Sequence, residues 1–185
     1  MLTRSEALAL LEASGPAPHE LHHALESEAV LRGLAGRLGE DADLWGLTGL
    51  LHDLDFPQTR DTPERHGIHG AEMLVGRLPE VAVHAIRAHN GDLNGHAPKT
   101  PLDFALRCGE SVTGLVAANA LIRPTGLVGM NPKSLKKKMK ARAFAAKVSR
   151  EIIGECKELG LDLGEFFQIA IDAITPLADE VGLAK

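Results

Sequence analysis

The sequence predicts an all-α protein, and three observations support this fold class. Aromatic residues make up only 3 % of the chain and tyrosine is absent, so the core must be built from smaller aliphatic side chains. That composition suits helices packed on helices better than a sheet, which favours aromatic and β-branched residues. Glycine and proline separate apolar stretches of helical period, and no alternating strand pattern of useful length occurs.

Length and composition limit the kind of protein this is. With 185 residues, of which 44 % are apolar, the chain is expected to form a single domain over residues 1–185. No apolar run reaches the ~18 residues of a membrane span. The start of the chain does not resemble a signal peptide, and two cysteines are too few for a disulfide framework, so we expect a cytoplasmic protein.

Local signals mark the helices in the first half of the chain. Thr3 and Glu6 have the spacing of a capping box and open the first helix. Gly39 stops a long second helix, and a third helix carries a run of leucines after an acidic start. Thr62-Pro63 has the form of an N-cap followed by proline at the first helical position. The helices expected here cover about 3–15, 18–38, 41–54 and 63–77.

Similar signals mark the second half. Pro79 opens a helix, and Thr100 with Asp103 has the spacing of another N-terminal cap. Asn131 precedes a proline and caps a helix that enters a basic segment, and Asp162 begins the last helix. The helices expected here cover about 79–90, 101–121, 132 into the basic segment, 143–159 and 162–176, joined by Gly/Pro-rich loops at 91–99 and 123–131.

Several histidine and acidic residues stand within apolar helical segments. His52 and Asp53 directly follow the leucines of the third helix, and His23 lies on an apolar face of the second. Glu110 sits in an apolar helix between two glycines that permit close approach. A buried carboxylate is costly unless it is paired or holds a metal. Imidazole nitrogen and carboxylate oxygen together suit a divalent transition ion.

The order of these residues is similar to that of the HD-domain superfamily of metal-dependent phosphohydrolases. Residues 50–55 (LLHDLD) resemble the HD motif, residues 66–74 resemble the third segment of the family, and residues 86–90 resemble the fourth. The resemblance covers about residues 19–121 and leaves 131–185 as a C-terminal helical extension. It implies a small stand-alone hydrolase with an HD-domain helical bundle, in which ligands converge from separate helices.

The resemblance also implies a ligand set. The first ion would be held by His23, His52, Asp53 and Glu110. His66 and His89 would hold a second ion or contact the substrate phosphate, and with Asp53 they would be the catalytic residues. Glu110 stands where the family usually has aspartate. Such ligands suit Mn, Fe, Co, Ni or Zn, and one ion is expected while a second is left open.

The implied activity is hydrolysis of a small phosphate ester or nucleotide by a metal-activated water, as in phosphoric ester hydrolases. The branch of the family that cleaves cyclic dinucleotides has a second histidine where this chain has Asn90, and a lysine after the HD pair that is missing here. Both departures argue against that substrate. Two alternatives remain open: an HD-type di-iron oxygenase, and a non-catalytic binding module that a metal stabilises.

Residues outside the ligand set provide candidates for substrate binding. Residues 131–150 hold eight basic side chains and no acidic one, which predicts either a solvated face or a basic wall that attracts an anionic substrate. Arg65, His69 and Lys136 are the candidates that follow, and Asp55 is placed to orient a ligand or a water. A small phosphorylated substrate is the expected partner. The overall charge of −5 does not favour nucleic acid, and homo-oligomerisation stays open.

Overall fold

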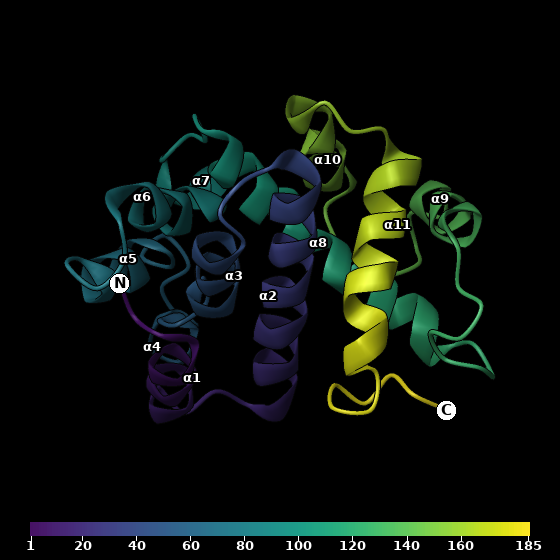
Figure 1. Cartoon of the computed structure of the whole chain (residues 1–185), viewed down its shortest axis with the longest axis horizontal. Helices are drawn as coiled ribbons and strands as arrows, with labels where there is room; N and C mark the ends of the chain where they lie inside the picture. The colour runs from purple at the N-terminus through teal and green to yellow at the C-terminus, as the bar shows by residue number, and fades with distance from the viewer.

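The computed structural model describes residues 1–185 and confirms the all-α prediction, with no strand. Helix α2 (Pro18–Leu38) packs against α3 (Ala42–Leu51), α8 (Pro101–Leu121) and α11 (Leu163–Ile174), as Figure 1 shows. Helix α6 (Glu80–His89) packs against α8 and α3 and completes the group of helices that surround the site. None of the helices combines the length and the apolar content needed to cross a lipid bilayer.

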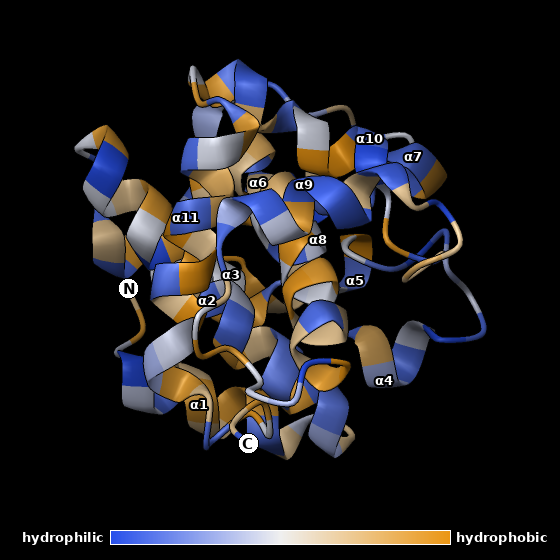
Figure 2. Ribbon diagram, turned by 90° about the vertical axis from the view of Figure 1, so that its right-hand side faces the viewer, coloured by the Kyte–Doolittle hydropathy of each residue, from blue (hydrophilic) through white to orange (hydrophobic).

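A single apolar core holds these helices together. Fully buried side chains come from α2 (Leu31 and Leu34), α3 (Leu50), α8 (Leu106) and α11 (Phe166). Burying one such side chain contributes roughly 1.5–3 kcal/mol. Figure 2 shows apolar and polar residues alternating along the same helices, the pattern of helices that turn one face inward. The core therefore fixes the helices from which the functional side chains project.

Most of the predicted helix boundaries are confirmed. Helix α1 (Arg4–Ala13) begins at the capping box of Thr3 and Glu6, and Gly39 ends α2 with a φ of 76°. The hydroxyl of Thr100 and the carboxylate of Asp103 cap the start of α8 reciprocally. Helix α9 (Pro132–Lys140) begins after Asn131, and Asp162 caps α11.

The prediction of a helix starting at Thr62-Pro63 was wrong. Helix α5 begins only at Ile68 and ends at Leu74, while a short helix α4 (Phe56–Thr59) forms where a loop was expected. The cause is a buried carboxylate. Asp55 Oδ2 accepts hydrogen bonds from the backbone N–H groups of Gly67 and Gly70, both at 2.9 Å, and Gly67 adopts a φ of 80°. These hydrogen bonds hold Gly67 in the interior, while residues 60–65 stay exposed outside a helix.

The helix expected at 143–159 was also wrong over residues 143–149. Residues 141–148 form turns, and only Arg150–Ile153 (α10) and the 3₁₀ helix Gly154–Leu159 are helical. The Arg150 guanidinium donates to the backbone carbonyls of Ala145 and Val148, which replaces helical hydrogen bonding there. Two further short elements are α7 (Gly91–Asn94), within an expected loop, and the 3₁₀ helix Thr175–Leu177.

Helices α2 and α3 approach closely at one glycine. A Cβ atom on Gly49 would lie 2.7 Å from the backbone oxygen of Ser27, a distance that the two helices cannot accommodate without moving apart. Gly49 precedes His52 by less than one turn, and Ser27 follows His23 by about one turn. The absence of a side chain at Gly49 therefore sets how closely these two histidines can meet.

We predict that Gly49→Ala lowers the free energy of unfolding by about 1–3 kcal/mol, the usual cost of forcing extra atoms into a packed interior. The measurement is chemical or thermal unfolding followed by circular dichroism. Gly36 is the matched control because it lies on exposed α2 surface with no atom near its Cβ position. Gly36→Ala should stabilise the helix by about 1 kcal/mol. Equal stability of the two variants would contradict the proposed close packing.

Candidate metal centre

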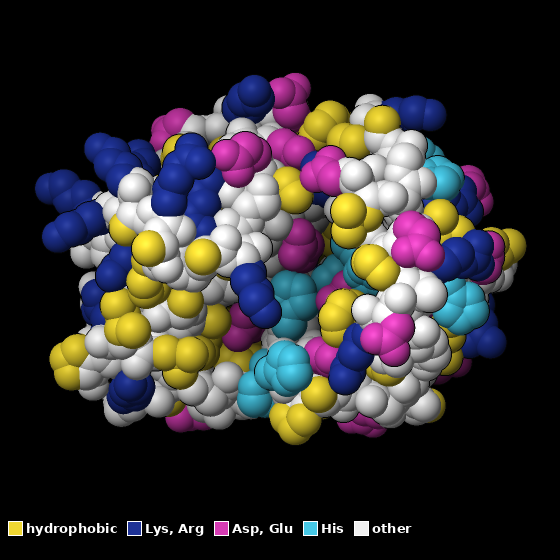
Figure 3. All heavy atoms as spheres, turned by 180° about the vertical axis from the view of Figure 1, so that it is seen from behind, with side chains coloured by type: hydrophobic (Ala, Val, Ile, Leu, Met, Phe, Trp, Pro, Cys, Tyr) yellow, Lys and Arg dark blue, Asp and Glu magenta, His cyan; other side chains and the backbone are white.

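The histidine and acidic residues singled out in the sequence lie together, and all of them except His52 line one cavity of about 500 Å³. They come from helices and turns far apart in the chain: His23 of α2, His52 and Asp53 at the end of α3, His66 before α5, His89 at the end of α6, and Glu110 of α8. Figure 3 shows histidine and acidic side chains at the bottom of a hollow, with basic side chains gathered to one side.

Asp53 stands between two histidine pairs. One group consists of His23, His52 and Asp53, and the other of Asp53, His66 and His89. The Nε2 atoms of His23 and His52 are 3.2 Å apart, and those of His66 and His89 are 3.0 Å apart. Asp53 Oδ1 lies 3.1 Å from His66 Nε2, and Asp53 Oδ2 lies 3.8 Å from His23 Nε2. The arrangement offers two adjoining ligand groups that share one carboxylate.

Backbone carbonyls orient two of these imidazoles. His52 Nδ1 lies 2.7 Å from the oxygen of Gly49, and His89 Nδ1 lies 2.6 Å from the oxygen of Ile86. A carbonyl can only accept, so we assign the ring proton to Nδ1 in both cases. The Nε2 lone pair of each ring then points into the cavity. Hydrogen bonding of the opposite nitrogen in this way is characteristic of metal-ligating histidines.

Side chains orient the other two imidazoles in the same sense. His66 Nδ1 lies 3.0 Å from the buried carboxylate of Asp55. His23 Nδ1 lies 2.9 Å from the hydroxyl oxygen of Thr113, whose proton is donated to the backbone oxygen of Glu110 at 2.7 Å. The Thr113 oxygen is therefore free to accept. The sequence analysis missed Thr113, although its position one turn beyond Glu110 on α8 was a usable signal.

Burial and charge act in opposite directions on the cluster. Burial lowers the pKa of His23 to about 4, which keeps this ring neutral. Burial also lowers the pKa of His66, but its hydrogen bonds to the carboxylates of Asp53 and Asp55 outweigh this and raise the pKa to about 10. Burial alone would raise the pKa of Asp53, yet the neighbouring imidazoles hold it well below its usual value. The carboxylates thus attract positive charge into the cluster.

Glu110 lies at the edge of the ligand groups. Its Oε2 atom is 3.7 Å from His23 Nε2, and its Oε1 atom accepts a hydrogen bond from the Ser111 hydroxyl at 2.6 Å. Burial raises the pKa of Glu110 to about 7. Among the six residues singled out as ligands, Glu110 is the one outside the two tightest groups.

The three residues predicted to bind substrate do not line this cavity. Arg65 is exposed and His69 is partly buried, and they lie 3.3 Å and 3.7 Å from Glu72. Lys136 lies 3.8 Å from Asp162 and lines a separate surface cavity. Lys147, another residue of the basic segment, lines the metal cavity instead. The irregular backbone of residues 141–148 brings Lys147 to the cavity. The sequence analysis expected a helix here and therefore did not predict this position of Lys147.

The donor set and the helical frame define the class of the protein: an all-α protein with histidine and carboxylate ligands contributed by separate helices. The profile of the HD domain matches residues 21–143, well over half of the chain, and the protein belongs to the HD domain family. HD domains bind divalent metals and are generally metal-dependent hydrolases. Among solved structures, none matches this chain at a significant level. The division into a core of about 19–121 and an extension of 131–185 stays a prediction.

We predict that Thr113→Val weakens divalent-metal binding by about 10–100-fold, the usual effect of removing a partner that orients a metal-ligating histidine. Valine keeps the size of the buried side chain but offers no oxygen to His23 Nδ1. Calorimetric titration of the metal-free protein with Zn²⁺ or Mn²⁺ gives the affinity. Thr113→Ser restores the hydroxyl and should bind as the unmodified protein does. Unchanged affinity in the valine variant would refute this role of Thr113.

Proposed function

We propose that the protein is a metal-dependent phosphohydrolase that cleaves a small phosphate ester or nucleotide. The observation that supports this best is the orientation of the four imidazoles. Every Nδ1 atom faces an oxygen acceptor, and every Nε2 atom faces the carboxylate of Asp53. Lone pairs 3.0–3.2 Å apart repel one another unless a cation or a proton lies between them. The donor set therefore fits a bound divalent ion.

His23, His52 and Asp53 would hold one ion, with Glu110 at its edge, and Asp53, His66 and His89 would hold a second. Imidazole and carboxylate donors suit Mn, Fe, Co, Ni or Zn. When bound, such an ion supplies Lewis acidity and lowers the pKa of its water from ~15.7 to about 7. Asp55 and Thr113 accept the Nδ1 protons of His66 and His23, which leaves the Nε2 atoms of both rings to face the ion.

Other residues of the cavity are suited to hold a phosphate group. Lys147 provides positive charge, while Asn90 and Ser149 line the same cavity with polar side chains. Lys147 and Ser149 also line an adjoining surface cavity with Arg142 and Arg150. The rim of the metal cavity is thus continuous with the basic segment, whose field would concentrate anionic substrates near the ligands.

The shared carboxylate also favours a second candidate function, a di-iron oxygenase, because two adjoining groups of donors are available. Elemental analysis of the purified protein, combined with assays in the presence and absence of oxygen, separates the two functions. Two irons per chain and an oxygen-dependent product would favour the oxygenase. Phosphate release that is independent of oxygen would favour the hydrolase.

We predict that Asp53→Ala abolishes both metal binding and phosphate release, because Asp53 belongs to both ligand groups. The test is elemental analysis followed by a panel of phosphate esters assayed with the native ion restored. Asp61→Ala is the control, since Asp61 is exposed and lines no part of the cavity. Stoichiometric metal and full turnover in Asp53→Ala would show that the assignment is wrong.

We predict that Lys147→Ala raises the KM for a phosphate ester several-fold. A charge-assisted hydrogen bond contributes about 1.5–3 kcal/mol, and exposure of Lys147 to solvent and salt reduces this contribution. The effect should shrink as the salt concentration rises. Lys137→Ala changes the net charge equally but lies outside the metal cavity, so its KM should change much less. Equal effects of the two variants would point to the general field of the basic segment.

A further inference from the structure

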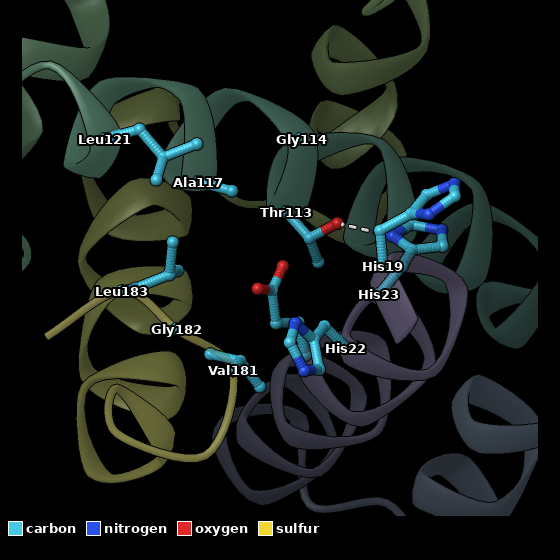
Figure 4. Close-up of a pocket in the computed structure, with 11 residues that line it drawn as sticks. His19, His22, His23, Thr113, Gly114, Ala117, Leu121, Val181, Gly182 and Leu183 are labelled. Carbon is cyan, nitrogen blue, oxygen red and sulfur yellow. Dashed lines mark hydrogen bonds between the residues drawn. The ribbon is translucent and has the colours of Figure 1, made fainter. Parts of the chain in front are cut away.

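A second cavity, of about 410 Å³, adjoins the metal cavity. The two cavities share His23 and Gly114 as lining residues. The ring of His23 forms part of the wall between them. Its Nε2 atom faces the other metal ligands, and its Nδ1 atom is bound by Thr113, which lines the second cavity (Figure 4). A molecule held at the metal centre therefore has room to extend past His23.

The walls of this second cavity combine apolar side chains with histidines and a threonine, and they come from three parts of the chain. Helix α8 contributes Ala117 and Leu121, and the C-terminal segment contributes Val181 and Leu183, while α2 lies opposite (Figure 4). His22 of α2 is half-buried beside the C-terminal segment. None of these residues belongs to the two metal-ligand groups.

One carboxyl side chain, Glu26 of α2, lines this cavity without a partner. It is only 4 % exposed, and its carboxyl group makes no hydrogen bond or ion pair with the protein. The other two buried glutamates of α2 are paired, Glu20 with Arg60 and Glu28 with Arg4. A buried carboxyl group without a partner destabilises the fold. Its position at the wall of an open cavity, beside apolar side chains such as Ala117 and Val181, points to a partner that comes from outside the chain.

The position of Glu26 suits the recognition of a molecule bound at the metal. Glu26 follows His23 by three residues of α2, which corresponds to about 4.5 Å along the helix axis. A group that donates a hydrogen bond would satisfy the carboxyl group. The apolar walls would enclose the carbon skeleton that joins this group to the phosphate. Burial raises the pKa of Glu26 to about 8, which agrees with the lack of a protein partner.

We propose that this cavity binds the organic part of the substrate and that Glu26 selects substrates carrying a hydrogen-bond donor, an ammonium or a hydroxyl group, at its far end. The proposal rests on the proposed phosphohydrolase function for the placement of the phosphate. The proposal assigns to Glu26 a role in specificity only, because Glu26 lines the second cavity and belongs to neither metal-ligand group.

The test uses the metal-loaded full chain and three series of phosphate monoesters, with two to six carbons and equal numbers of heavy atoms. The series differ only in their end group, which is ammonium, hydroxyl or methyl. Affinity is measured by calorimetry at low temperature, and occupancy is followed by NMR of the methyl groups of Val181 and Leu183. Esters that end in a donor should bind at least about tenfold more tightly than esters of the same length that end in a methyl group. This ratio corresponds to the free energy of one hydrogen bond.

Two substitutions of Glu26 test its role. Glu26→Leu should remove the preference for a donor and raise the melting temperature, because it replaces an unpaired buried carboxyl group with an apolar side chain of similar size. Glu26→Gln distinguishes the two kinds of donor. An ammonium preference should fall with the loss of charge, whereas a hydroxyl preference should persist.

A pair of alanines on α8 provides a test that leaves Glu26 in place. Ala117→Met fills the cavity and should weaken binding of the longer esters about tenfold, while Ala118→Met, one residue further along, lies outside the cavity and should not. The proposal is overturned if donor and methyl esters bind equally, if the preference survives in Glu26→Leu, if the Val181 and Leu183 methyl signals do not respond, or if no ester binds. Failure of the phosphohydrolase function would appear separately, as esters that bind without releasing phosphate.

Discussion

The close approach of imidazole lone pairs is the interaction on which the rest of the site depends. Two pairs of Nε2 atoms stand 3.0 Å and 3.2 Å apart around the partly buried carboxylate of Asp53. The rings of such a cluster repel one another unless positive charge lies between them. The core, rich in Leu and Phe, supplies the free energy that keeps the rings in place, and so does the close contact of α2 and α3 at Gly49. A frame of packed helices can impose this arrangement because packed interiors yield little to strain.

Helix ends explain the orientation of two of the four histidines, His52 and His89. His52 follows the last residue of α3, and His89 is the last residue of α6. The final carbonyls of a helix have no partner within the helix, so each ring donates to a carbonyl three residues before it. The same ends carry partial negative charge, which favours a cation nearby. One feature of helix geometry thus provides the orientation, the correct tautomer and a favourable field.

Charge is distributed differently on the two sides of the metal centre. Lys147 and the basic segment lie on the side of the metal cavity that suits a phosphate group. Beyond His23 lies the second cavity, which is lined in part by apolar side chains and where Glu26 is buried without a partner. Under the proposed function, the two sides would receive the two halves of a phosphate ester, an anionic group and a carbon skeleton with a polar end. The metal ligands lie between the two sides, where the bond to be cleaved would be placed.

The sequence by itself determined the helical class and most helix boundaries, because caps such as Thr3 with Glu6, and breakers such as Gly39, act within a few residues of the chain. It also identified the residues that meet at the cavity, since the order of the histidines and acids resembles one family. Contacts between distant segments decided the rest. Asp55 delays the start of α5, and Arg150 replaces a helix with turns that carry Lys147, in place of Lys136, to the cavity. Thr113 and Glu26 acquire their roles only from neighbours that folding brings beside them. The sequence places Thr113 one turn beyond Glu110, but only the packing of α2 on α8 brings it to His23.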